Sequence, residues 1–201
     1  DTPKGRFLFA RNEITGGDTA ALLAPIIIDI LTHFPWPKSQ RWGRGKFRWV
    51  RPLHRINILF DGKPLAGALD LGGGDAITFG ATSCGHYFEA PDDIDLAGVT
   101  SLDDVKARLR AGYVMLDQYE RHDAIISEAK KLAASQSCHL NEVQLGSYLA
   151  DIAGLVEWPT PLMGQIEDRF MVLPPELLQA TIATHQKYIT LSDADGKFSS
   201  H

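Results

Sequence analysis

Apolar residues recur every three or four positions near the start of the chain, as they do along one side of a helix. The pattern covers Leu22–Ile30, and Asp18 stands where the N-cap of such a helix is expected. Pro35 and Pro37 follow, and proline ends helices because it lacks an amide hydrogen. The pattern therefore predicts a helix from Asp18 to about His33.

Similar patterns, each with its own start signal, predict four further helices. Ser101 and Asp117 are each followed three residues later by an acidic residue, which resembles a capping box. Asn141 supplies a cap for a shorter helix that ends before Gly154, and the proline pair at 174 and 175 suits a first helical turn. The predicted spans are residues 102–111, 118–135, 142–153 and 176–183.

Strands are predicted where residues alternate between apolar and polar or are rich in β-branched and aromatic types. Residues 47–60 have this character, and Pro52 divides them into an edge piece and a more buried piece at 56–60. Asp61-Gly62 is a strong hairpin signal, and the glycines at 72–74 mark another turn. The other predicted strands are 6–10, 64–69, 76–79, two short stretches within 155–172, and 188–191.

The order of these elements predicts an α+β (mixed α/β) fold, with a mostly antiparallel sheet flanked by about four to five helices. Residues 5–98 form a sheet-rich part with one helix, 99–154 a helical part, and 155–198 a closing sheet and helix. The chain begins at Asp1 without a methionine, so we expect residues 1–201 to be one fragment of a longer polypeptide.

Composition is that of a globular protein outside the membrane. Hydrophobic residues make up 44% of the 201 residues and charged residues 22%, and no apolar run is long enough to span a bilayer. Two cysteines are too few for a disulfide framework, and we recognise no secretory signal. We therefore expect a cytoplasmic protein with both cysteines as thiols.

Charge is unevenly distributed along the chain. Net charge is -5, yet the stretch 38–55 holds seven basic residues and no acidic one, which leaves 13 basic and 25 acidic residues elsewhere. Basic residues mixed with aromatic ones can hold a phosphate backbone and stack on bases. The alternative is a strand whose solvated face is basic. The RNA-binding candidates are Lys38, Arg41, Trp42, Arg44, Lys46, Arg48, Trp49 and Arg51.

The other motifs lack the residues that a catalytic site or a metal site requires. The glycines at 72–74 lack the lysine and hydroxyl residue of a phosphate-binding loop and precede Asp75. The pairs Cys84 with His86 and Cys138 with His139 lack the four converging ligands of a structural zinc site. A thiol-imidazole pair at Cys84 and His86 has no recognisable orienting carboxylate. We predict no catalytic residue and no metal ligand.

The polar-cluster candidates are His86, His185, Gln186 and Lys187. In a strand, His185 and Lys187 would share one face, while Gln186 and Tyr188 would share the other with Tyr188 in the core. Such a cluster could form a polar site in a groove, for RNA, or a structural hydrogen-bond network. Both interpretations stay open at this point.

Several segments in order resemble one protein family. They are Phe34-Pro35, Pro37-Lys38-Ser39, Arg41-Trp42-Gly43, Val50-Arg51-Pro52-Leu53-His54, Gly85-His86 with Phe88 and Ala90-Pro91, Leu155-Val156-Glu157-Trp158-Pro159, Leu162-Met163-Gly164, Pro174-Pro175-Glu176 and Thr184-His185-Gln186-Lys187-Tyr188. Together they span roughly Gly5 to Lys197 and are similar to the beta subunit of the bacterial heterotetrameric glycyl-tRNA synthetase. Cys84 and Tyr87 depart from the pattern, since that family commonly has arginine at these positions.

The resemblance implies a role in protein biosynthesis as part of an ATP-dependent glycine-tRNA ligase. In that family glycine activation with ATP and magnesium takes place on the separate alpha subunit, so this fragment is expected to bind no cofactor and to be inactive alone. The implied partners are the alpha subunit and glycine tRNA, with no DNA and no membrane, and the implied role is tRNA recognition and alpha-beta assembly.

The resemblance also implies two alternative functions. The fold is expected to resemble the editing-type domain of the phenylalanyl-tRNA synthetase beta subunit, which hydrolyses mischarged tRNA. A pocket for glycine can exclude every larger amino acid sterically, which lowers the need for such editing. A pure protein-protein scaffold is the other alternative.

Overall fold

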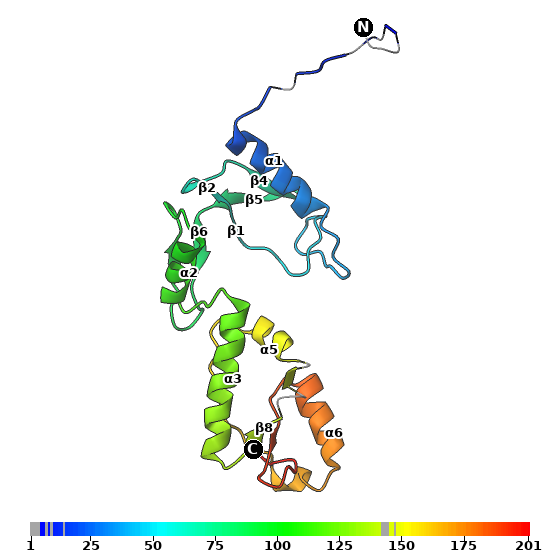
Figure 1. Ribbon diagram of the computed structural model, residues 1–201, viewed down its shortest axis with the longest axis vertical. Helices are drawn as coiled ribbons and strands as arrows, with labels where there is room; N and C mark the ends of the chain where they lie inside the picture. The colour runs from blue at the N-terminus through cyan, green and yellow to red at the C-terminus, as the bar shows by residue number, and fades with distance from the viewer. Residues whose placement is uncertain (1–4, 7, 9, 14, 142–144, 147) are drawn as a thin grey trace. The chain divides into compact units, whose positions relative to one another are not determined.

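The computed structural model describes residues 5, 6, 8, 10–13, 15–141, 145, 146 and 148–201. The chain divides into two compact units, Asp1–Ala81 and Thr82–His201, called unit 1 and unit 2 below. Figure 1 shows their helices and strands. The predicted three-part division of the chain stays a prediction. The predicted strand at 6–10 includes residues 7 and 9, which lie outside the described residues.

Unit 1 begins with the helix that the apolar periodicity predicts. Helix α1 covers Thr19–Thr32, and the Asp18 carboxylate caps it by accepting a hydrogen bond from the amide of Ala21 at 2.9 Å. Ala24 is the buried residue of this helix and packs with Leu69 and Phe79 of the sheet. The predicted cap and the predicted end near His33 are confirmed.

The sheet of unit 1 has three strands in the order β1-β5-β4. Strand β5 (Asp75–Gly80) pairs antiparallel with β4 (Ala68–Gly72) and parallel with the short strand β1 (Ile56–Asn57). The turn between β4 and β5 uses three glycines with φ of 78°, 68° and 90°, a conformation that glycine adopts without steric cost. The predicted turn and the strand after it are confirmed.

The predicted Asp61-Gly62 hairpin is also present in unit 1. Strands β2 (Leu59–Phe60) and β3 (Lys63–Pro64) pair antiparallel, and both turn residues have positive φ, as a two-residue hairpin of type I′ requires. The predicted continuous strands on either side are shorter than expected. Residues 47–55 contribute only an isolated bridge between Gln40 and Trp49, and the return strand stops at Pro64.

Unit 2 opens with a strand pair and two helices. Strands β6 (Thr82–Cys84) and β7 (Asp93–Asp95) pair antiparallel. Helix α2 (Leu102–Ala111) is capped by Ser101, and helix α3 (Gln118–Ser135) is capped by Asp117, as predicted. The ammonium of Lys106 lies 2.8 Å from the carboxylate of Asp117 and links the two helices. This hydrogen bond lowers the pKa of Asp117 and raises that of Lys106.

The remaining elements of unit 2 are short and irregularly spaced. They are β8 (His139–Leu140), α5 (Leu149–Leu155), the 3-10 helix η1 (Asp168–Phe170), α6 (Pro175–Gln179), the π-helical segment η2 (Ala180–His185) and β9 (Leu191–Ser192). β8 and β9 pair antiparallel. The predicted helix after Asn141 falls partly on residues 142–144 and 147, outside the described residues, and α5 runs past Gly154 to Leu155.

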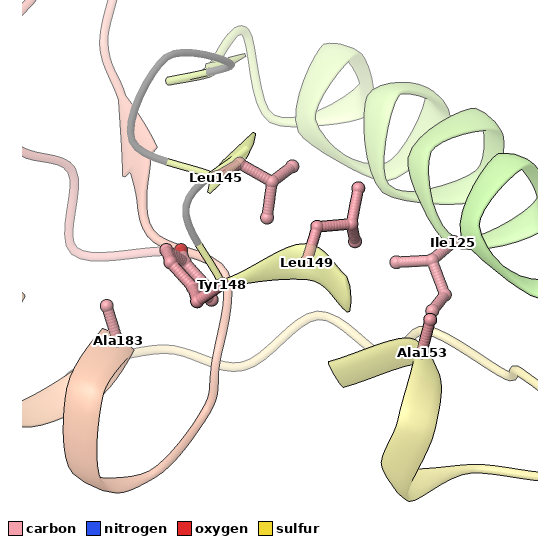
Figure 2. Packing of buried hydrophobic residues seen from close by; sticks show 6 residues of the cluster. All are labelled: Ile125, Leu145, Tyr148, Leu149, Ala153 and Ala183. Carbon is pink, nitrogen blue, oxygen red and sulfur yellow. The ribbon is translucent and has the colours of Figure 1, made fainter. Parts of the chain in front are cut away.

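A hydrophobic cluster holds α3, α5 and η2 together. Figure 2 shows its buried members, which are Ile125, Leu145, Tyr148, Leu149, Ala153 and Ala183. Leu149 is 1% exposed and Leu145 2% exposed, so these two leucines are among the best-buried side chains of the unit. Burial raises the pKa of the Tyr148 phenol in the same cluster.

Two sequence predictions for the closing part are wrong. The described residues between 155 and 172 contain no strand; Pro159, Pro161 and Gly164 interrupt the alternating pattern, and no neighbouring strand pairs with it. Of the predicted strand 188–191 only Leu191 lies in a strand, β9, and residues 185–188 are not a strand either, since η2 ends at His185 and no strand follows before Leu191. Tyr188 is 65% exposed, and Ile189 packs against the core in its place.

The coarse fold prediction is confirmed. The described part of the chain is a mixed α+β structure in which the parallel β1-β5 pair is the exception among antiparallel pairs. Among the helices of the described residues, none is long and apolar enough to cross a membrane.

Candidate functional site

The basic block of the sequence forms an irregular loop in unit 1, here called the basic loop (residues 34–51). Gln40 and Trp49 exchange backbone hydrogen bonds of 2.8 and 3.1 Å across its base. The amides of Lys46 and Phe47 both donate to the carbonyl of Leu71 in β4, at 2.8 and 3.1 Å. The loop is therefore closed on itself and fixed to the sheet by backbone contacts.

Aromatic side chains pack together inside the basic loop. Trp49 is central, with ring centroids 4.9 Å from Trp36, 5.5 Å from Phe34 and 5.9 Å from Phe47. Trp42 joins through an edge contact of 5.9 Å with Phe47. The Nε1 of Trp36 is buried and finds no hydrogen-bond partner among the described residues. Trp42 and Trp49 are half-buried in this cluster, and their stacking on RNA stays a prediction.

The cations of the basic loop lie at the surface. All six predicted basic candidates, Lys38, Arg41, Arg44, Lys46, Arg48 and Arg51, are exposed.

The cations differ in their partners. Arg44 lies 3.6 Å from the carboxylate of Asp75, and Arg48 donates to the hydroxyl and carbonyl of Ser39 at 3.1 and 2.7 Å. The four others, Lys38, Arg41, Lys46 and Arg51, form no ion pair with any carboxylate in the described part of the chain. Their charge is thus available to an anionic partner.

Glycines allow the close approach of the basic loop to the β4-β5 turn. A Cβ on Gly73 would lie 2.8 Å from the carbonyl oxygen of Arg44, and one on Gly45 would lie 2.3 Å from that of Leu71. Real Cβ atoms do not approach backbone oxygens so closely, so both positions require glycine. The three-glycine turn therefore supports the basic loop.

The polar candidate His86 has a structural role in unit 2. It lies in the loop between β6 and β7, and its Nδ1 accepts hydrogen bonds from the amides of Phe88 (3.3 Å) and Glu89 (3.1 Å). Its own amide donates to the carbonyl of Gly112 at 2.8 Å. This arrangement leaves Tyr87 and Phe88 about four-fifths exposed at the tip of the loop.

The other polar candidates lie at the end of η2, and the structure does not bring them to His86 by any described hydrogen bond or ion pair. Lys187 has a positive φ of 59°, and its ammonium lies 3.1 Å from the carboxylate of Asp151. The amide of Gln186 donates to the carbonyl of Thr181. His185 and Gln186 are exposed.

Sequence reasoning missed an apolar cavity in unit 2. Its volume is about 970 Å³, and its walls come from α3, residues 156 and 159–166, α6 with η2, and residues 186–191. Gln186 and Lys187 belong to the lining, whereas His185 and His86 do not. The available signal was the apolar-polar alternation at 155–172, which predicted two short strands.

The geometry shows no group of side chains for metal binding among the described residues. No three His, Cys, Asp or Glu side chains of that part gather around one point. Cys84 is exposed, and Cys138 is buried with its sulfur 3.3 Å from the hydroxyl of Ser199.

Comparison with known proteins identifies the family. Residues 1–201 match the family described as glycyl-tRNA synthetase beta subunit. The glycine-tRNA ligase beta subunit of Rhodospirillum centenum is 40% identical over 216 residues, which cover 98% of this chain and 30% of that protein. The same subunit of Paracoccus denitrificans is 44% identical over 190 residues, which cover 94% of this chain and 27% of that protein.

A third relative, from Phenylobacterium zucineum, is 37% identical over 194 residues and is covered to 28% of its length. The chain thus spans less than a third of the length of these relatives. The match includes the basic loop, the three-glycine turn and the walls of the apolar cavity, since it extends over the whole chain. The chain belongs to the glycyl-tRNA synthetase beta subunit family.

Proposed function

We propose that this chain acts within a glycine-tRNA ligase and that its basic loop contacts the tRNA backbone. The observation that carries the proposal is the set of four exposed, unpaired cations on a loop that is held in place by its own aromatic cluster. A loop that is already ordered loses little conformational entropy when it binds. Lysine and arginine bind phosphates through counterion release, which needs no acidic or catalytic group in the chain.

The rest of the reaction belongs elsewhere in the proposed enzyme. The alpha subunit would use ATP and magnesium to activate glycine, and this chain would bind neither. Its other contribution would be architectural, in assembly with the alpha subunit in the cytoplasm. The relatives are named as beta subunits of glycine-tRNA ligase, which supports an alpha subunit as partner.

An editing function has less support from the geometry. Hydrolysis of mischarged tRNA would need polar groups that position a water or nucleophile in a cleft. The cavity of unit 2 is mainly apolar, and the Nδ1 of His86 is occupied by two backbone amides. The expected likeness to the editing-type domain of the phenylalanyl-tRNA synthetase beta subunit stays a prediction of the resemblance.

Charge reversal in the assembled enzyme tests the proposed tRNA contact. Arg41→Glu with Lys46→Glu should weaken binding of glycine tRNA by roughly tenfold at moderate salt, as expected for two lost phosphate contacts. The slope of log Kd against log salt should fall by about 1 for each contact. Filter binding or fluorescence anisotropy over a range of salt concentrations measures both quantities.

The control makes the same change in charge at other positions. Lys63 and Lys197 are exposed and lie outside the basic loop, so Lys63→Glu with Lys197→Glu should leave the salt slope unchanged. If both double variants weaken binding equally, the effect is one of net charge, and the basic loop is not the contact surface.

A further inference from the structure

Unit 2 leaves one wall of its core uncovered. The apolar cavity of about 970 Å³ opens between α3 and the α6-η2 helix, beside the small cluster of Figure 2. Six large apolar side chains that line it are at least one-third exposed: Val156, Leu162, Phe170, Leu173, Leu177 and Tyr188. Folded monomers rarely leave so many adjacent apolar side chains in water, so such a surface indicates a binding partner.

The backbone along this wall also lacks partners. Residues 160–165 neither donate nor accept a backbone hydrogen bond within the part of the chain that the structure describes. The next residue, Ile166, donates to the carbonyl of Ser200 at 2.6 Å. Unpaired backbone beside an apolar cavity suits an added polypeptide segment, which can supply both apolar side chains and main-chain hydrogen bonds.

The relatives supply a candidate for the occupant. The match with the Rhodospirillum centenum protein covers 98% of this chain but only 30% of that protein. Most of that polypeptide therefore lies outside the match. His201 lines the cavity, and its neighbour Ser200 bonds to Ile166, so residues close to 201 already form part of the wall. A segment attached to the same chain reaches this site at high effective concentration.

We propose that the apolar cavity of unit 2 is the docking site of an apolar segment of the same beta subunit, from outside residues 1–201. The segment inserts branched or aromatic side chains between α3 and η2 and pairs its backbone with residues 160–165. The proposal rests on family membership and on the geometry of unit 2. It is independent of the proposed tRNA contact in unit 1.

Cysteine labelling tests this docking in the beta subunit that contains the sequence, expressed without the alpha subunit. Leu162 is 87% exposed and lines the cavity, whereas Val172 is 83% exposed and does not. In a Cys84→Ser background, Leu162→Cys should react with a maleimide at least about tenfold more slowly than Val172→Cys. In a chain of residues 1–201 the two cysteines should react at similar rates, with mass spectrometry identifying the labelled peptide.

A second pair of variants guards against local misfolding. Leu177→Cys lies on the cavity wall, and Leu155→Cys is similarly exposed but does not line the cavity. Slow labelling of both wall positions in the beta subunit alone supports the proposal. Equal labelling of wall and control positions overturns it.

Other occupants give different results, and each overturns the proposal. Protection that appears only after addition of the alpha subunit assigns the cavity to that partner. Protection of the beta subunit that is lost on dilution assigns it to a second copy. Protection in residues 1–201 alone shows that the cavity closes on its own side chains.

Discussion

The two units of this chain expose different kinds of surface. In unit 1 the basic loop presents four cations without an ion pair to any described residue, and its aromatic cluster and backbone bonds lie within the same unit. In unit 2 large apolar side chains are exposed around the cavity, namely leucine, valine, phenylalanine and tyrosine, beside polar ones such as Gln165 and Gln186. The first surface is stable in water as it stands, whereas the second costs free energy until something covers it.

This difference separates two ways of recognising a partner. Solvated cations attract a polyanion at long range, and salt weakens that attraction. An apolar cavity needs shape and contact, and salt at moderate concentration changes its affinity little. The proposed tRNA contact of unit 1 should therefore weaken with salt, whereas the proposed polypeptide contact of unit 2 should depend on salt little.

The largest expected effect concerns the core beside the cavity. Leu149→Ala removes a side chain that is 1% exposed and should lower the free energy of unfolding by about 2 to 5 kcal/mol. Leu155→Ala in the same helix α5 changes a side chain that is 60% exposed and should cost about 0.5 kcal/mol or less. Urea unfolding followed by far-UV circular dichroism measures both.

Equal costs at the two positions would show that the cluster around Leu149 does not hold unit 2 together. The contrast between a packed side and an uncovered side of this unit would then be wrong.

A smaller effect tests how the basic loop is fixed to the sheet. Gly73→Ala and Gly74→Ala both place a side chain at positive φ, which costs roughly 1 to 2 kcal/mol. Only the Cβ at 73 also meets the carbonyl of Arg44, while the space around Gly74 is open. Gly73→Ala should therefore shift the basic loop and change the emission of Trp36, Trp42 and Trp49.

Tryptophan fluorescence and tRNA binding of the two glycine variants report on this contact. Gly74→Ala should keep the wild-type emission spectrum and the wild-type affinity. Identical spectra for both variants would mean that the three-glycine turn does not support the loop.

The smallest effect is a pH dependence between helices α2 and α3. The Lys106 ammonium holds the pKa of Asp117 below its usual value, so the pair stabilises unit 2 at neutral pH. That stabilisation is lost as pH falls through the lowered pKa, because the carboxylate is then protonated. Asp117→Asn keeps an acceptor for the Tyr119 amide but has no charge, so its Tm should fall less in acid.

Thermal unfolding between about pH 5 and about pH 3 measures this difference. Asp195→Asn, at an exposed carboxylate, is the control and should follow the wild-type curve. If Tm falls with pH equally in the wild type and in Asp117→Asn, the Lys106-Asp117 pair does not stabilise unit 2.

Local signals in the sequence predicted local structure well. Asp18, Ser101 and Asp117 cap α1, α2 and α3, and the Asp61-Gly62 and 72–74 turns form as predicted. Each of these signals acts through hydrogen bonds or backbone conformations within about four residues. Such signals need no knowledge of the rest of the fold.

Predictions that depend on distant partners did less well. The alternation at 155–172 indicated strands, yet a strand exists only where another strand pairs with it, and none does in the described residues. Pro174 and Pro175 correctly indicated a helix start. Nothing in the sequence showed that α6 would continue as a π-helical segment to His185 and leave Tyr188 exposed.

The sequence predicted which basic residues form the candidate site, but it did not predict their partners or the packing of the loop. Segregation of charge identified the basic loop, because an uninterrupted basic stretch is visible in sequence. Pairing is not visible there, and the structure shows Arg44 with Asp75 and Arg48 with Ser39. Trp42 and Trp49 of the basic loop were predicted as a surface for stacking on bases. The packing of Trp49 against Phe34 and Phe47 was not predicted, because it depends on how the loop closes.

The most direct test of the central claim is a salt titration of glycine tRNA binding by the 201-residue chain, with its fold verified by circular dichroism. If four unpaired cations each neutralise a phosphate, log Kd should rise with log salt with a slope of about 3. Binding that weakens steeply with salt is the predicted result. A folded chain that does not bind, or that binds without salt dependence, would contradict the assignment of the basic loop as a tRNA surface.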